Sequence, residues 1–243
     1  MGISPGAAYE ALSAMQKPAR GVSLYSRYIN RPLGRRFAAL SAWLGLTPNG
    51  VTVVSAIMTA GAALLIAIPR PSLISGLGVA ALLVLGFALD AADGQLARLL
   101  HRASPAGEWF DHVVDAGKAV CLHGAVLIAA YRYFTPDLWW LLVPLAYQAL
   151  SVVVQAGGTL RELLGRIARG GTAKPPADRR RWAPIILLVA DSGVFGLIFL
   201  TWGWPLIFMV VYSAFFVANL CVGAALLMKW MRELSDLART SAT

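Results

Sequence analysis

Long apolar runs separated by short polar turns dominate the hydropathy pattern of this chain. Six of these runs are long enough to cross a lipid bilayer as helices, since a bilayer core of about 30 Å needs roughly 20 apolar residues. The six predicted helices span about 50–68, 73–99, 106–132, 138–158, 183–201 and 205–228. The pattern therefore predicts an all-α fold, an integral membrane bundle of six transmembrane helices.

A basic and aromatic segment precedes the first apolar run. Between Leu24 and Leu44, arginines alternate with tyrosine, leucine and phenylalanine. This predicts an N-terminal amphipathic helix in the membrane interface, with Pro32 near its start; a solvated basic loop is the alternative. The preceding residues 1–22 are small and polar, and we expect the very start to be poorly ordered. Asn49 is the expected N-cap of the first transmembrane helix.

The composition favours a membrane protein over a soluble one. Hydrophobic residues make up 58% of the 243 residues and charged residues only 14%, and the mean hydropathy is +0.66. The formal net charge of +9 comes from Lys and Arg in patches between the apolar runs. Membrane lipid headgroups or substrate phosphates are the natural partners of such patches. No basic face on a polar, soluble fold is visible, so we expect no nucleic-acid partner.

The basic residues are distributed unevenly between the two sides of the predicted bundle. They concentrate in the N-terminal segment, the 99–105 link, the 159–182 linker and the C-terminal tail, whereas the opposite turns hold only Arg70 and Arg132. By the positive-inside rule, both termini face the cytoplasm. We therefore expect a multi-pass protein of the cytoplasmic membrane.

Four aspartates flank the link between the second and third predicted helices. Asp90 and Asp93 are three residues apart, and Asp111 and Asp115 are four apart, so each pair shares one helix face. Four carboxylates this close cannot all remain ionised unless cations neutralise them. Hard oxygen ligands suit Mg²⁺ or Mn²⁺, and two such ions suit a diphosphate. This stretch predicts a metal site on the cytoplasmic side.

Small residues and one arginine lie between the two aspartate pairs. Gly94 and Gly107 let a ligand approach the backbone, and Ala97 keeps the neighbouring space open. Arg98 can bind a phosphate through two hydrogen bonds. A carboxylate not fully occupied by metal could accept a proton from an incoming hydroxyl, which favours displacement at a phosphorus. A proton or ion relay in a transporter is the alternative, but a relay would not need these residues at these spacings.

The complete spacing, Asp-x2-Asp-Gly-x2-Ala-Arg-x8-Gly-x3-Asp-x3-Asp, resembles the signature of the CDP-alcohol phosphotransferase family. The Thr-Pro-Asn-Gly-Val-Thr stretch at 47–52 resembles its companion motif, and the resemblance covers roughly residues 45–230. We expect three parts in the chain: a cytoplasmic segment with the interfacial helix at 1–46, a six-helix transmembrane catalytic domain at 47–230, and a cytoplasmic tail at 231–243.

The resemblance also implies a role for each matching position. The metal ligands would be Asp90, Asp93, Asp111 and Asp115, holding two Mg²⁺ or Mn²⁺ ions on the donor diphosphate. Asp115 would also be the general base. Nucleotide contacts would come from Asn49, Val51, Thr52, Gly94, Ala97, Arg98, Ser104 and Gly107. The implied reaction is attack by an acceptor hydroxyl on the CDP-linked phosphorus, with CMP leaving. Dimers are common in the family, so a homodimer is one expectation for this chain.

The acceptor alcohol, with or without a phosphate, is less well specified. Phosphatidylinositol-phosphate synthases of this family carry Lys and Arg at the cytoplasmic end of the fourth helix, where this chain has residues 151–158 without a cation. Candidate acceptor residues are Lys118, Arg161, Arg179, Arg180, Arg181 and Asp191. For Lys118 the alternative is pairing with a carboxylate, and for the arginines it is attraction to lipid headgroups. Asp191, about two turns into the fifth predicted helix, is expensive to bury unless it serves a polar cavity.

The donor is CDP-diacylglycerol in the favoured interpretation, which places the protein in phospholipid synthesis. Residues 17–32 resemble the segment before the membrane core of di-inositol-phosphate-phosphate synthases, which use a polar CDP-alcohol. The alternative is therefore transfer from a polar CDP-alcohol such as CDP-inositol to an inositol phosphate or a lipid acceptor.

Overall fold

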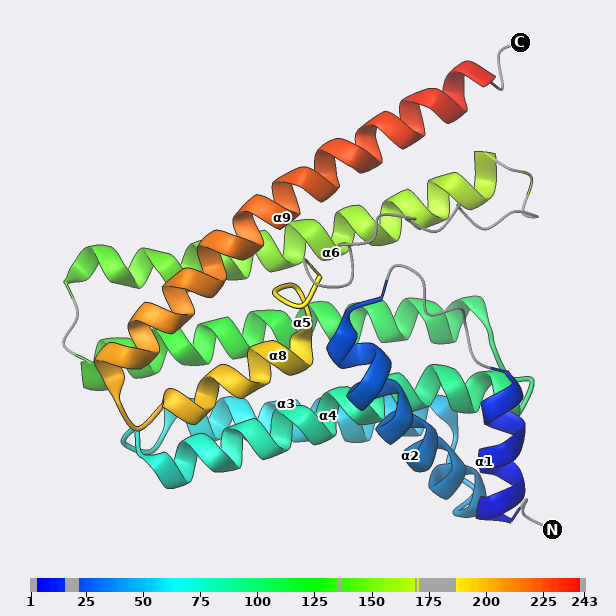
Figure 1. The fold of residues 1–243 in the computed structure, drawn as a ribbon, viewed down its shortest axis with the longest axis horizontal. Helices are drawn as coiled ribbons and strands as arrows, with labels where there is room; N and C mark the ends of the chain where they lie inside the picture. Colours follow the sequence, from blue (N-terminus) through cyan, green and yellow to red (C-terminus); the bar gives the residue numbers. More distant parts are fainter. Residues whose placement is uncertain (1–3, 16–21, 135–136, 169, 171–186, 241–243) are drawn as a thin grey trace.

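The chain folds into helices throughout the part that the computed structural model describes, which is residues 4–15, 22–134, 137–168, 170 and 187–240 (Figure 1). The α-helices are α1 (Pro5–Ala14), α2 (Arg31–Trp43), α3 (Pro48–Ala67), α4 (Leu73–Leu99), α5 (Pro105–Ala129), α6 (Leu142–Ala168), α8 (Ser192–Leu197) and α9 (Pro205–Thr240). Short π or 3-10 segments adjoin them at Ser26–Asn30, Ala130–Phe134, Leu138–Leu141 and Ile198–Thr201. The all-α prediction is confirmed for these ranges.

Hydroxyl side chains cap the three helices that surround the acidic stretch. Thr47, Ser72 and Ser104 each accept a hydrogen bond from a backbone N–H in the first turn of α3, α4 and α5. The prediction that Asn49 caps α3 is wrong. Pro48 already takes the first helical position, where its missing N–H costs nothing, so the cap falls on Thr47.

Five helices are long and apolar enough to cross a membrane. They are Pro48–Ala67, Leu73–Leu99, Pro105–Phe134, Leu138–Ala168 and Pro205–Leu237. The fourth and the last extend past their predicted ends at 158 and 228. Hydropathy marks only the apolar part of each helix, and Leu, Arg and Glu beyond it have high helix propensity and prolong the helix. The predicted helix at 183–201 lies partly outside the described residues, and its described part is a turn followed by the short apolar helix Ser192–Thr201. Five long spans are therefore seen among the described residues, where six were predicted.

An aromatic core holds the short α8 and the beginning of α9 in the bundle. Trp202, Phe208 and Tyr212 have no exposed surface. The ring centroids of Phe134 and Trp202 lie 5.1 Å apart, and those of Trp202 and Phe208 lie 4.6 Å apart. Stacking of this kind adds to the free energy of apolar burial, and it keeps in place a helix of only six residues that would not form alone.

Both N-terminal helices pack on α4 (Figure 1). Ala8 and Leu12 of α1 and Ala38 of α2 form a buried cluster with Leu96 of α4. Pro5–Ala14, within the small and polar stretch 1–22, thus forms a packed helix, whereas the very start of the chain, residues 1–3, lies outside the described residues. The other side of α2 exposes apolar side chains, including Leu40 and Trp43, beside the exposed Arg36, in keeping with the predicted amphipathic helix.

Candidate metal and active site

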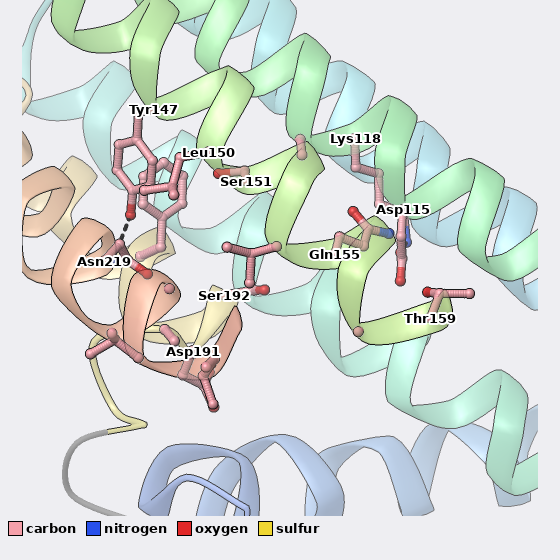
Figure 2. Close-up of a pocket in the computed structure, with 18 of the residues that line it drawn as sticks. Asp115, Lys118, Tyr147, Leu150, Ser151, Gln155, Thr159, Asp191, Ser192 and Asn219 are labelled. Carbon is pink, nitrogen blue, oxygen red and sulfur yellow. Dashed lines mark hydrogen bonds and ion pairs between the residues drawn. The ribbon is translucent and has the colours of Figure 1, made fainter. Parts of the chain in front are cut away.

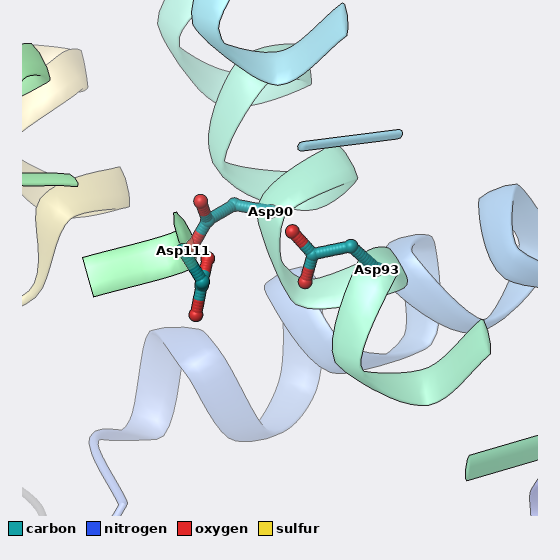
Figure 3. A group of neighbouring side chains, drawn as sticks. All are labelled: Asp90, Asp93 and Asp111. Atoms are coloured by element: carbon teal, nitrogen blue, oxygen red, sulfur yellow. The ribbon is translucent and has the colours of Figure 1, made fainter. Parts of the chain in front are cut away.

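Three aspartates from two helices converge at one point. Asp90 and Asp93 come from the last turns of α4, and Asp111 comes from the beginning of α5 (Figure 3). One carboxylate oxygen from each lies within 4.8 Å of the others. The helical spacing explains the geometry, since residues three apart on α4 present both carboxylates to the facing end of α5.

The three-aspartate group has the chemistry of a divalent-cation site. Asp111 Oδ1 is buried, and among the residues that the structure describes it has no hydrogen-bond partner. Asp93 is buried too, and its Oδ2 accepts a hydrogen bond from Thr52 Oγ1 at 2.6 Å. A buried carboxylate oxygen without a donor is costly unless a cation approaches it. Oxygen-only ligands of this kind fit Mg²⁺ or Mn²⁺.

Asp115 lies beside this group rather than within it. Its Oδ1 accepts a hydrogen bond from Lys118 Nζ at 2.9 Å, and the same ammonium forms an ion pair with Asp90. The structure thus brings three of the four predicted aspartates together and links the fourth to them through a buried lysine. For Lys118, the pairing with carboxylates considered from the sequence is what the structure shows.

The predicted nucleotide-binding residues lie around the ends of α3, α4 and α5. A Cβ added to Gly107 would stand 3.2 Å from Ser104 Oγ and 3.4 Å from Asn49 Oδ1, so a larger residue there would crowd both polar side chains. Gly94, Ala97 and Arg98 are partly buried on the last turns of α4. Val51 is buried in the cluster formed with α1 and α2, whereas Thr52 reaches Asp93.

A cavity of about 640 Å³ adjoins the three-aspartate group. Asp115 and Lys118 line one end, and Asp191 and Asn219 line the other (Figure 2). Asp90, which pairs with Lys118, also lines the cavity. The polar residues that α6 contributes to the lining include Ser151, Gln155 and Thr159. Sequence reasoning assigned no role to these three, although their spacing of four residues within an apolar run puts them on one helix face.

The prediction that Asp191 lies two turns inside a helix is wrong. Asp191 caps the N-terminus of α8. Its Oδ1 accepts a hydrogen bond from the Gly193 N–H at 2.9 Å. Its Oδ2 accepts from the Ser26 hydroxyl at 2.6 Å and also from the Ser23 hydroxyl. Burial, and then the charge of Asp191, raises the pKa of Tyr25 between these two serines. The carboxylate therefore joins the N-terminal segment to α8.

The remaining acceptor candidates are cations. Arg161 lines the cavity, and its Nε donates to Glu233 Oε2 on α9 at 2.9 Å. Arg179, Arg180 and Arg181 lie outside the described residues. The structure thus places Arg161 at the cavity but already paired with a carboxylate.

Comparison with known families gives one match. The family model described as CDP-alcohol phosphatidyltransferase matches residues 45–218, which cover most of the chain and include the three-aspartate group. The comparison with curated proteins finds no match.

Proposed function

Because this chain belongs to the CDP-alcohol phosphatidyltransferase family, we propose that it transfers a phosphatidyl or phospho-alcohol group from a CDP-linked donor to an acceptor hydroxyl, releasing CMP. The observation that carries this proposal is the three-aspartate group at one end of a cavity. CDP-diacylglycerol is the favoured donor, since the catalytic residues lie in apolar helices long enough to span a membrane.

The donor diphosphate would lie at the ends of α4 and α5. Asp90, Asp93 and Asp111 would hold two Mg²⁺ or Mn²⁺ ions, with Asp115 as a further ligand. Such ions would neutralise the diphosphate and make its phosphorus more electrophilic. Arg98 would bind a phosphate oxygen. Gly107 supports this placement, because it leaves space beside Asn49 and Ser104 for the nucleotide.

Asp115 is the proposed general base. As the acceptor oxygen forms its bond to the donor phosphorus, its proton passes to the Asp115 carboxylate. The bond between that phosphorus and the CMP phosphate oxygen breaks, and CMP carries away the electron pair. Asp115 suits this role because it lines the cavity and because Lys118 forms ion pairs with both Asp115 and Asp90. The lysine keeps the Asp115 carboxylate in one orientation.

The proposed orientation has both termini and the three-aspartate group on the cytoplasmic side. This needs an even number of crossings, so we propose that the short apolar helix Ser192–Thr201 belongs to the sixth. Its support is the packing of α8 on α4, with Phe195, Ile198 and Phe199 in the main apolar core.

Release of CMP by the purified protein tests the proposed function. The assay would combine CDP-diacylglycerol or a polar CDP-alcohol with a panel of alcohols in the presence of Mg²⁺. We expect CMP with at least one pair. No CMP from any pair, together with cation-coupled uptake in proteoliposomes, would instead support a transporter.

A further inference from the structure

Three polar residues form one face of α6 toward the cavity. Ser151, Gln155 and Thr159 occur at every fourth position and all line the cavity. Polar side chains in a membrane-spanning helix are costly when they face lipid, so they usually face a cavity or a partner. We call these three residues the α6 polar face.

Neighbouring helices fix the orientation of this face. Gln155 Nε2 donates to the backbone oxygen of His112 on α5 at 3.2 Å, which leaves the amide oxygen to accept from a ligand hydroxyl. Ser151 Oγ lies 3.1 Å from His123 Nε2. Figure 2 shows Gln155 and Thr159 close to Asp115, at the same end of the cavity. A ligand hydroxyl bound by Gln155 would therefore lie near the proposed base.

The charges around the cavity are mainly acidic. Four carboxylates line it, those of Asp90, Asp115, Glu162 and Asp191. Among the described residues, its Lys and Arg side chains are Lys118 and Arg161, and each is already paired with a carboxylate. A phosphate on the acceptor would have to displace the carboxylate that is paired with Lys118 or with Arg161. Glu162 and Asp191, which are not among the proposed metal ligands, would repel it. An uncharged hydroxyl meets no such repulsion.

The size of the cavity fits a small molecule. Its volume of about 640 Å³ lies within the range of roughly 300–1,000 Å³ that is usual for small-molecule sites. Several hydrogen-bonding side chains distributed along one wall suit a ligand with several hydroxyl groups.

We propose that the acceptor is an uncharged polyol, held through its hydroxyl groups by Gln155 and Thr159 on α6 so that one hydroxyl faces Asp115. The inference rests on the proposed transfer reaction and adds the chemical class of the acceptor. It assigns specificity to α6, outside the aspartates and glycines that define the donor site.

The first test compares acceptors that differ only by a phosphate. The full-length protein in lipid nanodiscs receives Mg²⁺ and CDP-diacylglycerol, with inositol or glycerol in one arm and their monophosphates in the other. The expected result is a kcat/KM at least tenfold higher for an uncharged polyol than for its phosphate. A preference for a phosphorylated acceptor overturns the acceptor inference and leaves the proposed function intact. No CMP with any acceptor, from CDP-diacylglycerol or from a polar CDP-alcohol, overturns both.

The second test changes the α6 polar face. Gln155→Leu removes the hydrogen-bonding groups, and we expect the KM for the polyol to rise about tenfold, the cost of one or two lost hydrogen bonds. Binding of CMP with Mn²⁺, followed by thermal shift, should stay unchanged, because the donor site is separate. The matched control is Ala156→Leu, since Ala156 is exposed on the same helix and does not line the cavity. An equal change in both variants contradicts the inference.

A gain of function completes the design. Gln155→Lys places a cation at the same position, and we expect it to shift the preference toward the phosphorylated acceptor by about tenfold or more. A variant that retains its CMP-binding thermal shift but shows no change in preference would remove Gln155 from the acceptor site.

Discussion

Lys118 and Asp115, one turn apart on α5, form an ion pair in which Nζ lies 2.9 Å from Oδ1. The same ammonium pairs with Asp90 on α4. One buried cation therefore connects the proposed base to the three-aspartate group, and it does so across two helices.

Replacement of this lysine tests its role. Lys118→Met keeps the length of the side chain and removes the charge, so Asp115 loses the partner that orients it. We expect kcat to fall at least tenfold while the KM for the acceptor stays within about twofold. Steady-state kinetics of CMP release measure both constants. A large rise in acceptor KM with kcat retained would instead make Lys118 an acceptor-binding residue.

Asp115→Asn removes the proposed proton acceptor without changing the shape of the side chain. General-base catalysis typically contributes about 10²–10⁴-fold, so CMP release should fall by about that factor. The melting temperature should stay close to that of the unchanged protein, which distinguishes lost chemistry from lost folding. Turnover close to that of the unchanged protein would exclude Asp115 as the base.

Thr52 is expected to tune the metal site from α3. Thr52→Val deletes the hydroxyl that donates to Asp93 Oδ2 at 2.6 Å. Loss of such a supporting hydrogen bond typically weakens metal affinity about 10–100-fold. Titration with Mn²⁺, followed by electron paramagnetic resonance, measures the affinity directly. Thr52→Ser keeps the hydroxyl and serves as the control, and equal affinities in both variants would argue against this role.

Metal removal should abolish activity reversibly. After treatment with a chelator, we expect no CMP release until Mg²⁺ or Mn²⁺ is restored. Asp111→Asn should require a markedly higher metal concentration, because Asp111 Oδ1 is a buried carboxylate oxygen that lacks a donor among the described residues. Full activity in excess chelator would refute the metal-dependent mechanism.

Gly193→Ala tests the junction between the N-terminal segment and α8. A methyl group at this position would overlap the ring of the buried Tyr25. Overpacking of this kind costs about 1–3 kcal/mol, so the melting temperature should fall by several degrees. Gly117→Ala is a suitable control, since a Cβ there meets nothing within 4 Å. Similar melting temperatures for the two variants would show that the junction tolerates the methyl group.

Much of the fold could be predicted because the bounds of most helices depend on neighbouring residues, through their hydropathy and the positions of prolines. The bounds of α3 and α4 agree with the apolar runs to within two residues. Asp191 was misplaced because its neighbours read as a continuous apolar helix, whereas its carboxylate is satisfied by serines 165 and 168 residues away. No local pattern contains that information.

In the candidate site, too, features set by local spacing could be predicted, whereas features set by contacts between distant helices could not. The spacing of the aspartates predicted their convergence, because both pairs lie on regular helices. The pairing of Lys118 with Asp90 depends on how α4 packs on α5, which the sequence does not state. The α6 polar face was visible as a spacing of four, but its importance depends on the cavity that it lines.

The junction between Ser23, Ser26 and Asp191 has a consequence for the order of assembly. The N-terminal segment leaves the ribosome first, yet its carboxylate partner follows 168 residues after Ser23. At a synthesis rate of about 5–20 residues per second, that partner arrives roughly 8–34 seconds later. The intervening helices α3 to α6 are therefore synthesised before the segment around Ser23 can complete its contacts with Asp191.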